Sequence, residues 1–103
     1  MGIISSLFAR NGVDVKSLIT NGAVIIDVRS PQEFASGHIA GSRNIPLDMI
    51  GSKATDLLAE GRTVVTCCRS GARSGMAQIL LKSKGIEVYN GGSWDTLNQK
   101  INK

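Results

Sequence analysis

Three short runs rich in apolar residues recur along the chain, at residues 23–28, 63–67 and 86–89. A run of this length that is bounded by glycine or polar residues is typical of a strand buried on both faces of a sheet. A brief extended segment, residues 43–46, ends at a proline, which strands tolerate mainly at their ends. The pattern therefore predicts three buried strands and one short extended segment.

Helices alternate with these strands, and residues typical of helix ends mark their boundaries. Asp14 can cap the first helix. Ser30, Pro31 and Glu33 form a capping box with proline at the first helical position. Gly61 can close the third helix, since glycine accepts the left-handed conformation common there. The predicted helices cover residues 15–19, 31–36, 50–60, 74–84 and 94–101.

The alternation of strands and helices indicates an α/β fold, with a small parallel sheet flanked by helices on both faces. In the fourth helix, Met76, Ile79 and Leu80 share one face, which we expect to pack on the sheet. Binding and catalytic sites of open parallel sheets form at the carboxyl ends of the strands. Asp27 and Cys68 stand at or just after two such ends and are the first candidate site residues.

The length of 103 residues suits one domain covering residues 1–103. Residues 1–12 are expected to form a short helical extension, with Ile3, Ile4, Leu7 and Phe8 on one face. The first residues lack the basic start and the length of a signal peptide. The expected location is cytoplasmic, with no membrane contact.

The charge balance favours anionic ligands over nucleic acid. Twelve Lys and Arg against eight Asp and Glu give a net charge of +4, which suits anionic substrates. The basic residues are scattered, and one Trp, one Tyr and two Phe are too few for a base-stacking platform. Arg69 and Arg73 are the exception, because they flank a glycine beside a cysteine.

The only two cysteines, Cys67 and Cys68, are adjacent. A disulfide between neighbours would be strained and would cross-link nothing, so a disulfide framework is excluded. With a single histidine there is no metal-site spacing either. Cys67 continues the predicted strand, so its side chain should point away from that of Cys68 and serve packing.

The segment from Cys68 to Ser74 runs from the end of a strand into the start of a helix. Such a turn can aim successive backbone N–H groups at one point, with the helix dipole behind them. Gly71 lets the loop curl. A thiolate placed there is stabilised, so the pKa of Cys68 should fall below its ordinary value. Arg73 could turn inward to hold an anion while Arg69 lies at the rim.

The loop sequence CRSGARS, residues 68–74, resembles the active-site loop of the rhodanese family. Other motifs similar to rhodanese signatures occur in order along the chain. They are Ile26-Asp27-Val28-Arg29, Glu33-Phe34, Gly37-His38-Ile39-Ala40-Gly41-Ser42, Asn44-Ile45-Pro46, and Gly91-Gly92 followed by Trp94. The resemblance covers about residues 14–97, nearly the whole chain, and the ordered motifs make it more specific than the loop alone.

The resemblance implies a sulfurtransferase that needs no cofactor or metal. Cys68 would take sulfur from an anionic donor such as thiosulfate, become a persulfide, and pass the sulfur to cyanide or a thiol. The partner to expect is a thioredoxin-like protein or a cysteine desulfurase. The loop residues that would bind the substrate are Arg69, Ser70, Gly71, Ala72, Arg73 and Ser74.

Three residues near the loop are expected to act structurally. Arg29 should pair with Glu33 or another nearby carboxylate and brace the sheet, although Asp27 could lie near the catalytic loop. His38 could form a Cys–His pair, but its glycine-flanked setting resembles a structural turn of the family in which the ring hydrogen-bonds backbone. Trp94 is expected to belong to the core.

Two alternatives remain open from the residues alone. A cysteine-dependent phosphatase or arsenate reductase also cradles an oxyanion between cysteine and arginine. Arg73 follows Cys68 after four intervening residues and Cys67 after five, and Gly71 fits the phosphatase position only from Cys68, so neither register satisfies that pattern fully. The second alternative is a sulfur carrier or binding module acting with a partner enzyme, although non-catalytic modules commonly lack the cysteine.

Overall fold

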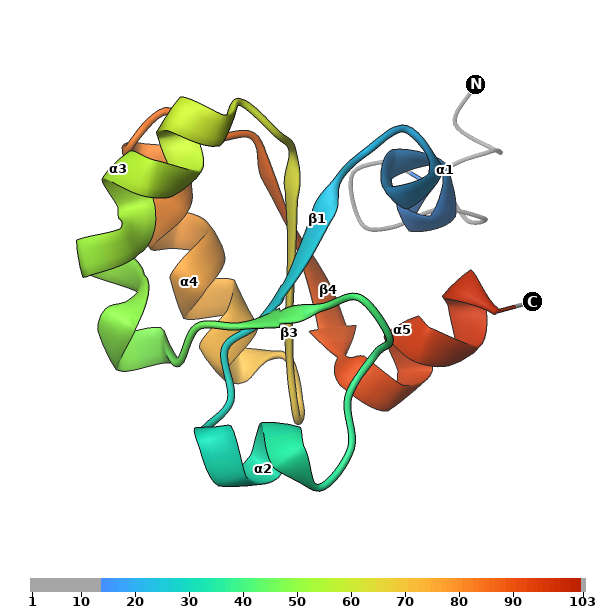
Figure 1. Cartoon of the computed structure of the whole chain (residues 1–103). Helices are drawn as coiled ribbons and strands as arrows, with labels where there is room; N and C mark the ends of the chain where they lie inside the picture. Colours follow the sequence, from blue (N-terminus) through green and yellow to red (C-terminus); the bar gives the residue numbers. More distant parts are fainter. Residues whose placement is uncertain (1–13, 103) are drawn as a thin grey trace.

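Four parallel strands form one sheet in the order β2-β1-β3-β4 (Figure 1). The computed structural model describes residues 14–102, and the helix predicted for residues 1–12 lies outside them. The strands are β1 (Val24–Asp27), β2 (Arg43–Asn44), β3 (Val64–Cys68) and β4 (Val88–Ser93). The helices are α1 (Val15–Thr20), α2 (Pro31–Ala35), the 3-10 helix η2 (Leu47–Met49), α3 (Ile50–Glu60), α4 (Ala72–Ser83) and α5 (Trp94–Ile101).

The two central strands, β1 and β3, come from two of the predicted apolar runs. Every residue of β1 and β3 is buried, and the strands pair in parallel with Val24 opposite Val64 and Asp27 opposite Cys67. Burial of both faces explains why these runs show no alternation between apolar and polar residues. The predicted parallel α/β fold is confirmed, and the short segment that ends before Pro46 contains the edge strand β2.

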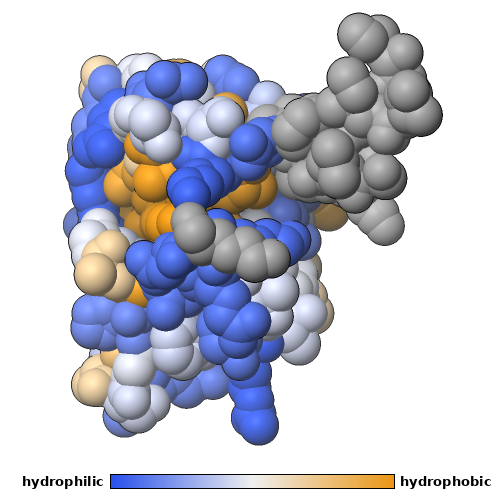
Figure 2. All heavy atoms as spheres, turned by 90° about the vertical axis from the view of Figure 1, so that its right-hand side faces the viewer, coloured by the Kyte–Doolittle hydropathy of each residue, from blue (hydrophilic) through white to orange (hydrophobic). Residues whose placement is uncertain are grey.

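Helices cover both faces of the sheet, as predicted. One apolar cluster joins alternate strand residues, such as Ile26 and Val64, to α3 and α4. The other cluster joins the intervening residues, such as Ile25 and Val65, to α1 and α5. Figure 2 views the side that carries α1 and α5, where apolar surface shows between hydrophilic residues. No helix within residues 14–102 is long and apolar enough to cross a membrane.

The structure confirms the helix ends that were predicted from capping residues. Asp14 caps α1 by accepting the backbone N–H of Lys16 at 3.1 Å. Ser30 and Glu33 form both hydrogen bonds of the capping box of α2. Gly61 ends α3 in the left-handed conformation, with φ of 71°.

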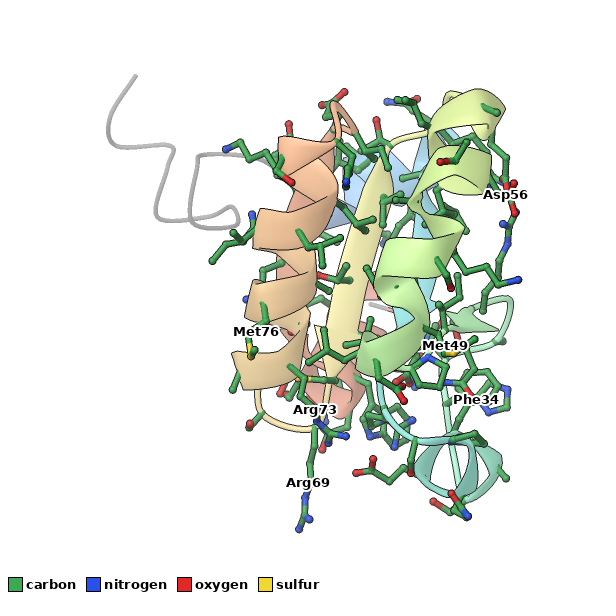
Figure 3. All side chains as sticks on the ribbon, turned by 90° about the vertical axis from the view of Figure 1, so that its left-hand side faces the viewer. Phe34, Met49, Asp56, Arg69, Arg73 and Met76 are labelled. Carbon is green, nitrogen blue, oxygen red and sulfur yellow. The ribbon has the colours of Figure 1, made fainter. Side chains whose placement is uncertain are left out.

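The predicted core face of α4 is wrong for two of its three residues, Met76 and Ile79, whereas the third, Leu80, packs against the core. Met76 and Ile79 are 60% and 72% exposed, and Leu80 is only partly buried; Figure 3 shows Met76 on the outer side of its helix. The residues that pack on the sheet include the smaller Ser74 and Ala77. Small side chains let the helix approach the strands closely, so position, and not hydrophobicity alone, decides which face is buried.

The strand β4 extends through Gly91 and Gly92, beyond the end of the predicted run 86–89. Its pairing with β3 shifts register between Thr66 and Cys68. A side chain at Gly91 would lie 2.8 Å from the carbonyl oxygen of Thr66, so only glycine allows this close approach. The shift carries the end of β4 alongside the loop that follows β3, which matters for the site described next.

Candidate active site

The carboxyl ends of the strands meet at one edge of the sheet, the lower edge in Figure 1. Asp27 is the last residue of β1, and Cys68 is the last residue of β3. The short helix α2 lies below this edge, and the loop 69–71 links Cys68 to the start of α4. The structure therefore places both candidate residues at the edge where the parallel topology predicted a site.

The two cysteines point to opposite faces of the sheet. Cys68 belongs to the apolar cluster with α3 and α4, whereas Cys67 belongs to the cluster with α1 and α5. Both are fully buried and neither is in a disulfide. The alternation of side chains along β3 thus separates the two thiols, as the sequence predicted.

Hydrogen-bonding groups of the loop and of the first turn of α4 surround the sulfur of Cys68. The backbone N–H of Gly71 donates to Sγ at 3.0 Å, and that of Ser74 donates at 3.4 Å. The Ser74 hydroxyl oxygen lies 3.3 Å from the same sulfur. Gly71 adopts φ of 100°, a conformation that glycine reaches without strain. Ala72 begins α4, so the Ser74 N–H belongs to the first helical turn, where it has no partner within the helix.

These donors lower the pKa of Cys68. Burial has the largest single effect and raises the pKa, but the Ser74 hydroxyl and the backbone N–H groups of Ser74, Gly71 and Ser70 together outweigh it. The net result is a pKa below the ordinary value of a thiol. The loop therefore favours the thiolate, which is the nucleophilic form of cysteine.

Cys67 shows the opposite behaviour one residue earlier. Burial, followed by the nearby charge of Asp27, raises the pKa of Cys67 to about 12. Its thiol therefore stays protonated at neutral pH and packs as a small apolar side chain.

The strand β4 supplies a residue that the sequence analysis did not single out. Asn90 Oδ1 lies 2.6 Å from the Ser74 hydroxyl oxygen and accepts the backbone N–H of Gly92 at 2.9 Å. Asn90 Nδ2 donates to the carbonyl oxygen of Gly71 at 3.2 Å. Asn90 directly follows the run 86–89 that was predicted as a strand, so the rule that singled out Asp27 and Cys68, proximity to the carboxyl end of a strand, could also have pointed to it.

The two arginines of the loop differ in their surroundings. Arg73 pairs with Glu33 of α2 through two hydrogen bonds, of 2.8 and 3.0 Å, and so does not turn inward toward the sulfur. This guanidinium, followed by the backbone N–H of Ser30, lowers the pKa of Glu33 to about 2. Arg69 is exposed at the tip of the loop and extends away from the body of the molecule in Figure 3.

The pair Asp27 and Arg29 forms a buried brace behind the loop. The Arg29 guanidinium contacts both carboxylate oxygens of Asp27, the shortest contact being 2.7 Å, and donates to the carbonyl oxygens of Glu33 and Gly37. It also lies 4.8 Å from the ring centroid of Trp94. Arg29 thus pairs with a carboxylate as predicted, and that carboxylate belongs to Asp27 and not to Glu33.

The ring of His38 contacts backbone, as predicted, and not the thiol. Its Nδ1 lies 2.7 Å from the carbonyl oxygen of Phe34, and the two rings stack with centroids 3.7 Å apart. A carbonyl oxygen can only accept, so Nδ1 carries the proton in this contact. Among residues 14–102, no group of three His, Cys, Asp or Glu side chains could hold a metal ion.

Comparison with known proteins places this geometry in a family. The sequence model of the rhodanese-like domain family matches residues 13–95 of this chain. An uncharacterized protein, YqhL of Bacillus subtilis, is 41% identical over 69 residues, which are 66% of this chain and 54% of that protein. The thiosulfate sulfurtransferase GlpE of Ectopseudomonas mendocina is 33% identical over 73% of this chain and 69% of its own.

A solved structure shows the same arrangement of elements. A structure described as a rhodanese with anions from E. coli superposes with a TM-score of 0.65 at 33% identity, covering 72% of this chain and 89% of that one. The chain spans only about half of the length of the Bacillus relative. The region matched by the family model, residues 13–95, contains the four strands and the cysteine loop of the site, and the chain therefore belongs to the rhodanese-like domain family.

Proposed function

We propose that this chain is a sulfurtransferase that carries sulfane sulfur on Cys68. The observation that carries the proposal is the ring of donors around the sulfur, in which two backbone N–H groups and the Ser74 hydroxyl face one buried thiol. Fixed donors of this kind stabilise an anion without reorganising during the reaction. The relatives named thiosulfate sulfurtransferase support the same class of activity.

In the first step the Cys68 thiolate attacks the outer sulfur of an anionic donor such as thiosulfate. A bond forms between Sγ and that sulfur, the S–S bond within the donor breaks, and its electron pair leaves with sulfite. Because the loop lowers the pKa of Cys68, no side-chain base is required to generate the nucleophile. This is consistent with the position of His38, whose ring contacts Phe34.

In the second step an acceptor nucleophile, cyanide or a thiolate, attacks the terminal sulfur of the persulfide. A new bond forms between acceptor and sulfur, the persulfide S–S bond breaks, and its electron pair returns to Cys68 as the thiolate. A thioredoxin-like protein would be an acceptor in this step, whereas a cysteine desulfurase would deliver sulfur to Cys68 in the first step; both steps would take place in the cytoplasm. The cycle closes with no change in the oxidation level of the resting enzyme and no cofactor.

The loop must shift for the donor to reach the thiol. Cys68 has no exposed surface in the structure, whereas Arg69 and Ser70 directly after it are exposed. A small outward movement of the loop 69–71 would open the sulfur without moving the strands, since Gly71 imposes little conformational restriction. Arg69 is placed to attract the anionic donor to this opening.

The phosphatase alternative is less well supported by the geometry. That chemistry needs the loop arginine to face the bound oxyanion, as a bidentate partner. Arg73 instead holds Glu33 with both of its terminal nitrogens. A sulfur atom held by backbone N–H groups needs no such arginine.

The test is the intact mass of the protein after incubation with thiosulfate. We expect a gain of one sulfur atom, which cyanide then removes as thiocyanate, and no gain in the Cys68→Ala variant. Hydrolysis of an aryl phosphate without any sulfur adduct would contradict the proposal and favour the phosphatase. A panel of donors, including glutathione persulfide and polysulfide, would then rank the physiological candidates by rate.

A further inference from the structure

Ser74 lies between the thiol of Cys68 and the side chain of Asn90. Asn90 has no role in the sulfur-transfer steps proposed for Cys68. The Ser74 hydroxyl oxygen is 3.3 Å from the sulfur of Cys68, 3.1 Å from the carbonyl oxygen of Gly71 and 2.6 Å from Asn90 Oδ1. A hydroxyl carries one proton, so it donates to only one acceptor at a time. The sulfur, the carbonyl and the amide oxygen therefore compete for a single proton.

The distances favour Asn90 as the acceptor while Cys68 is protonated. A separation of 2.6 Å is short for a hydroxyl donor, and at 3.3 Å the thiol can donate in turn to the Ser74 oxygen. When the thiol proton leaves to a buffer base in solution, the thiolate becomes the stronger acceptor because it is charged. Ser74 then turns its proton to the sulfur.

Asn90 remains fixed through this change because it has other partners. Its Oδ1 still accepts the N–H of Gly92, and its Nδ2 still donates to the carbonyl of Gly71. The opposite orientation of the amide would set two N–H groups against each other at Gly92 and two oxygens against each other at Gly71, so the contacts define one orientation.

The hydrogen bond from Asn90 Nδ2 to the carbonyl oxygen of Gly71 connects β4 to the loop. Gly71 accepts from Asn90 through its carbonyl and donates to the Cys68 sulfur through its N–H. One amide side chain is therefore linked to both groups, Ser74 and Gly71, that hold the sulfur.

We propose that Asn90 is a positioning residue for the thiol: its side-chain oxygen shares the Ser74 proton with Cys68, and its side-chain nitrogen holds the loop against β4. Asn90 touches neither Cys68 nor any substrate in this account and acts through Ser74 and Gly71. Its relevance to sulfur transfer rests on the proposed function, whereas its effect on the thiol does not.

The test is the pH dependence of Cys68 alkylation by iodoacetamide, a neutral reagent, in the Asn90→Asp variant. Aspartate keeps the accepting oxygens, loses the donor to Gly71 and adds a charge that retains the Ser74 proton. We expect the midpoint of the alkylation profile to move to higher pH, with a rate at neutral pH about tenfold lower. The residue is exposed, so the variant should fold.

Asn21→Asp is the matched control. Asn21 is exposed at the C-terminal end of α1, at the opposite end of the sheet, so the same added charge should leave the midpoint unchanged. Peptide mapping assigns the alkylated cysteine in each case. An unchanged midpoint in Asn90→Asp would overturn the proposal.

A Ser74→Ala background separates positioning from charge. Without the hydroxyl there is no proton to share, so Asn90→Asp can act on the sulfur only by its charge and by the lost contact with Gly71, and its shift of the midpoint should be clearly smaller than in the parent. Equal shifts in both backgrounds would overturn the positioning role. Alkylation needs no sulfur donor, so it tests Asn90 independently of sulfur transfer. If Asn90→Asp shifts the midpoint less in the Ser74→Ala background but the protein forms no thiosulfate adduct, only the proposed function is contradicted.

Discussion

Cys67 and Cys68 are adjacent in the sequence, equally buried, and chemically opposite. The pKa of Cys67 rises to about 12, whereas that of Cys68 falls below its ordinary value. Burial raises the pKa of both thiols, so it does not explain why the two pKa values shift in opposite directions. What differs is the supply of donors, because the loop aims N–H groups at Cys68 while Cys67 faces apolar side chains and the charge of Asp27.

The comparison shows that the strand β3 and the loop after it have different roles in setting the reactivity of the two thiols. The alternation of side chains along β3 sends the two thiols to opposite faces. The loop and the first turn of α4 then act on only one of those faces. Reactivity here depends on hydrogen-bond geometry, and the following predictions test that conclusion in order of decreasing effect.

The largest expected effect separates the two thiols directly. Cys68→Ser should lower the rate of thiocyanate formation from thiosulfate and cyanide by about a thousandfold or more, because it removes the nucleophile. Cys67→Ser should keep most of the rate, since the same substitution lies on the opposite face. Steady-state kinetics on both variants, with circular dichroism to verify folding, measure the difference. Equal losses of rate in the two variants, both folded, would mean that the two thiols do not differ in reactivity as proposed.

The second prediction concerns the brace on the side of Cys67. Asp27 is fully buried, and its charge is balanced by Arg29. Arg29→Met leaves that charge unpaired, so the free energy of unfolding should fall by about 3–5 kcal/mol. Urea unfolding measures the loss, and the double variant Asp27→Asn with Arg29→Met should recover part of it. A single variant as stable as the parent would contradict the structural role of this pair.

The parts of the fold that depend on local signals could be predicted from the sequence. Asp14, the capping box at Ser30 and Gly61 each act within a few residues, and each marks a helix end that the structure confirms. The buried strands were equally predictable because their apolar runs need no knowledge of partners. The separation of Cys67 from Cys68 follows from strand geometry alone.

The features that were missed depend on contacts between distant segments. Arg73 and Glu33 are 40 residues apart, and the sequence offers several other partners for each charge. Met76 and Ile79 were assigned to the core of α4 because they are apolar, but the smaller Ala77 packs against the sheet. Asn90 directly follows a predicted strand, but its contacts with Ser74 and Gly71, 16 and 19 residues away, depend on how β4 lies beside β3 and the loop, which no local pattern encodes.

The third prediction uses the opposite pKa shifts of the two thiols. The pKa of Cys67 is raised from 9.0 to about 12, so this thiol contributes stability that is complete below pH 9 and is lost as the pH rises to about 12. Cys67→Ala should therefore lose less stability than the parent over this range. Urea midpoints measured at intervals above pH 8 give the slope.

Cys68→Ser provides the contrasting control for that measurement. A lowered pKa stabilises the folded protein above the ordinary value of 9.0 and loses this effect as the pH falls through the folded value. Removing Cys68 should therefore abolish a gain in stability that occurs below pH 9 and leave the loss between pH 9 and about 12 unchanged, whereas removing Cys67 makes that loss shallower. A loss above pH 9 that became as shallow in Cys68→Ser as in Cys67→Ala would refute the assigned shifts.

The smallest expected effect concerns the exposed arginine beside Cys68. Arg69→Ala should raise the KM for thiosulfate by about three- to tenfold, because a single exposed charge steers an anion only modestly. The KM for an uncharged organic polysulfide should change less, and added salt should reduce the difference. Lys84→Ala, an exposed cation at the far end of α4, is the matched control and should leave both constants unchanged. An equal effect of Arg69→Ala on both donors would show that this arginine supports the loop and does not attract the donor.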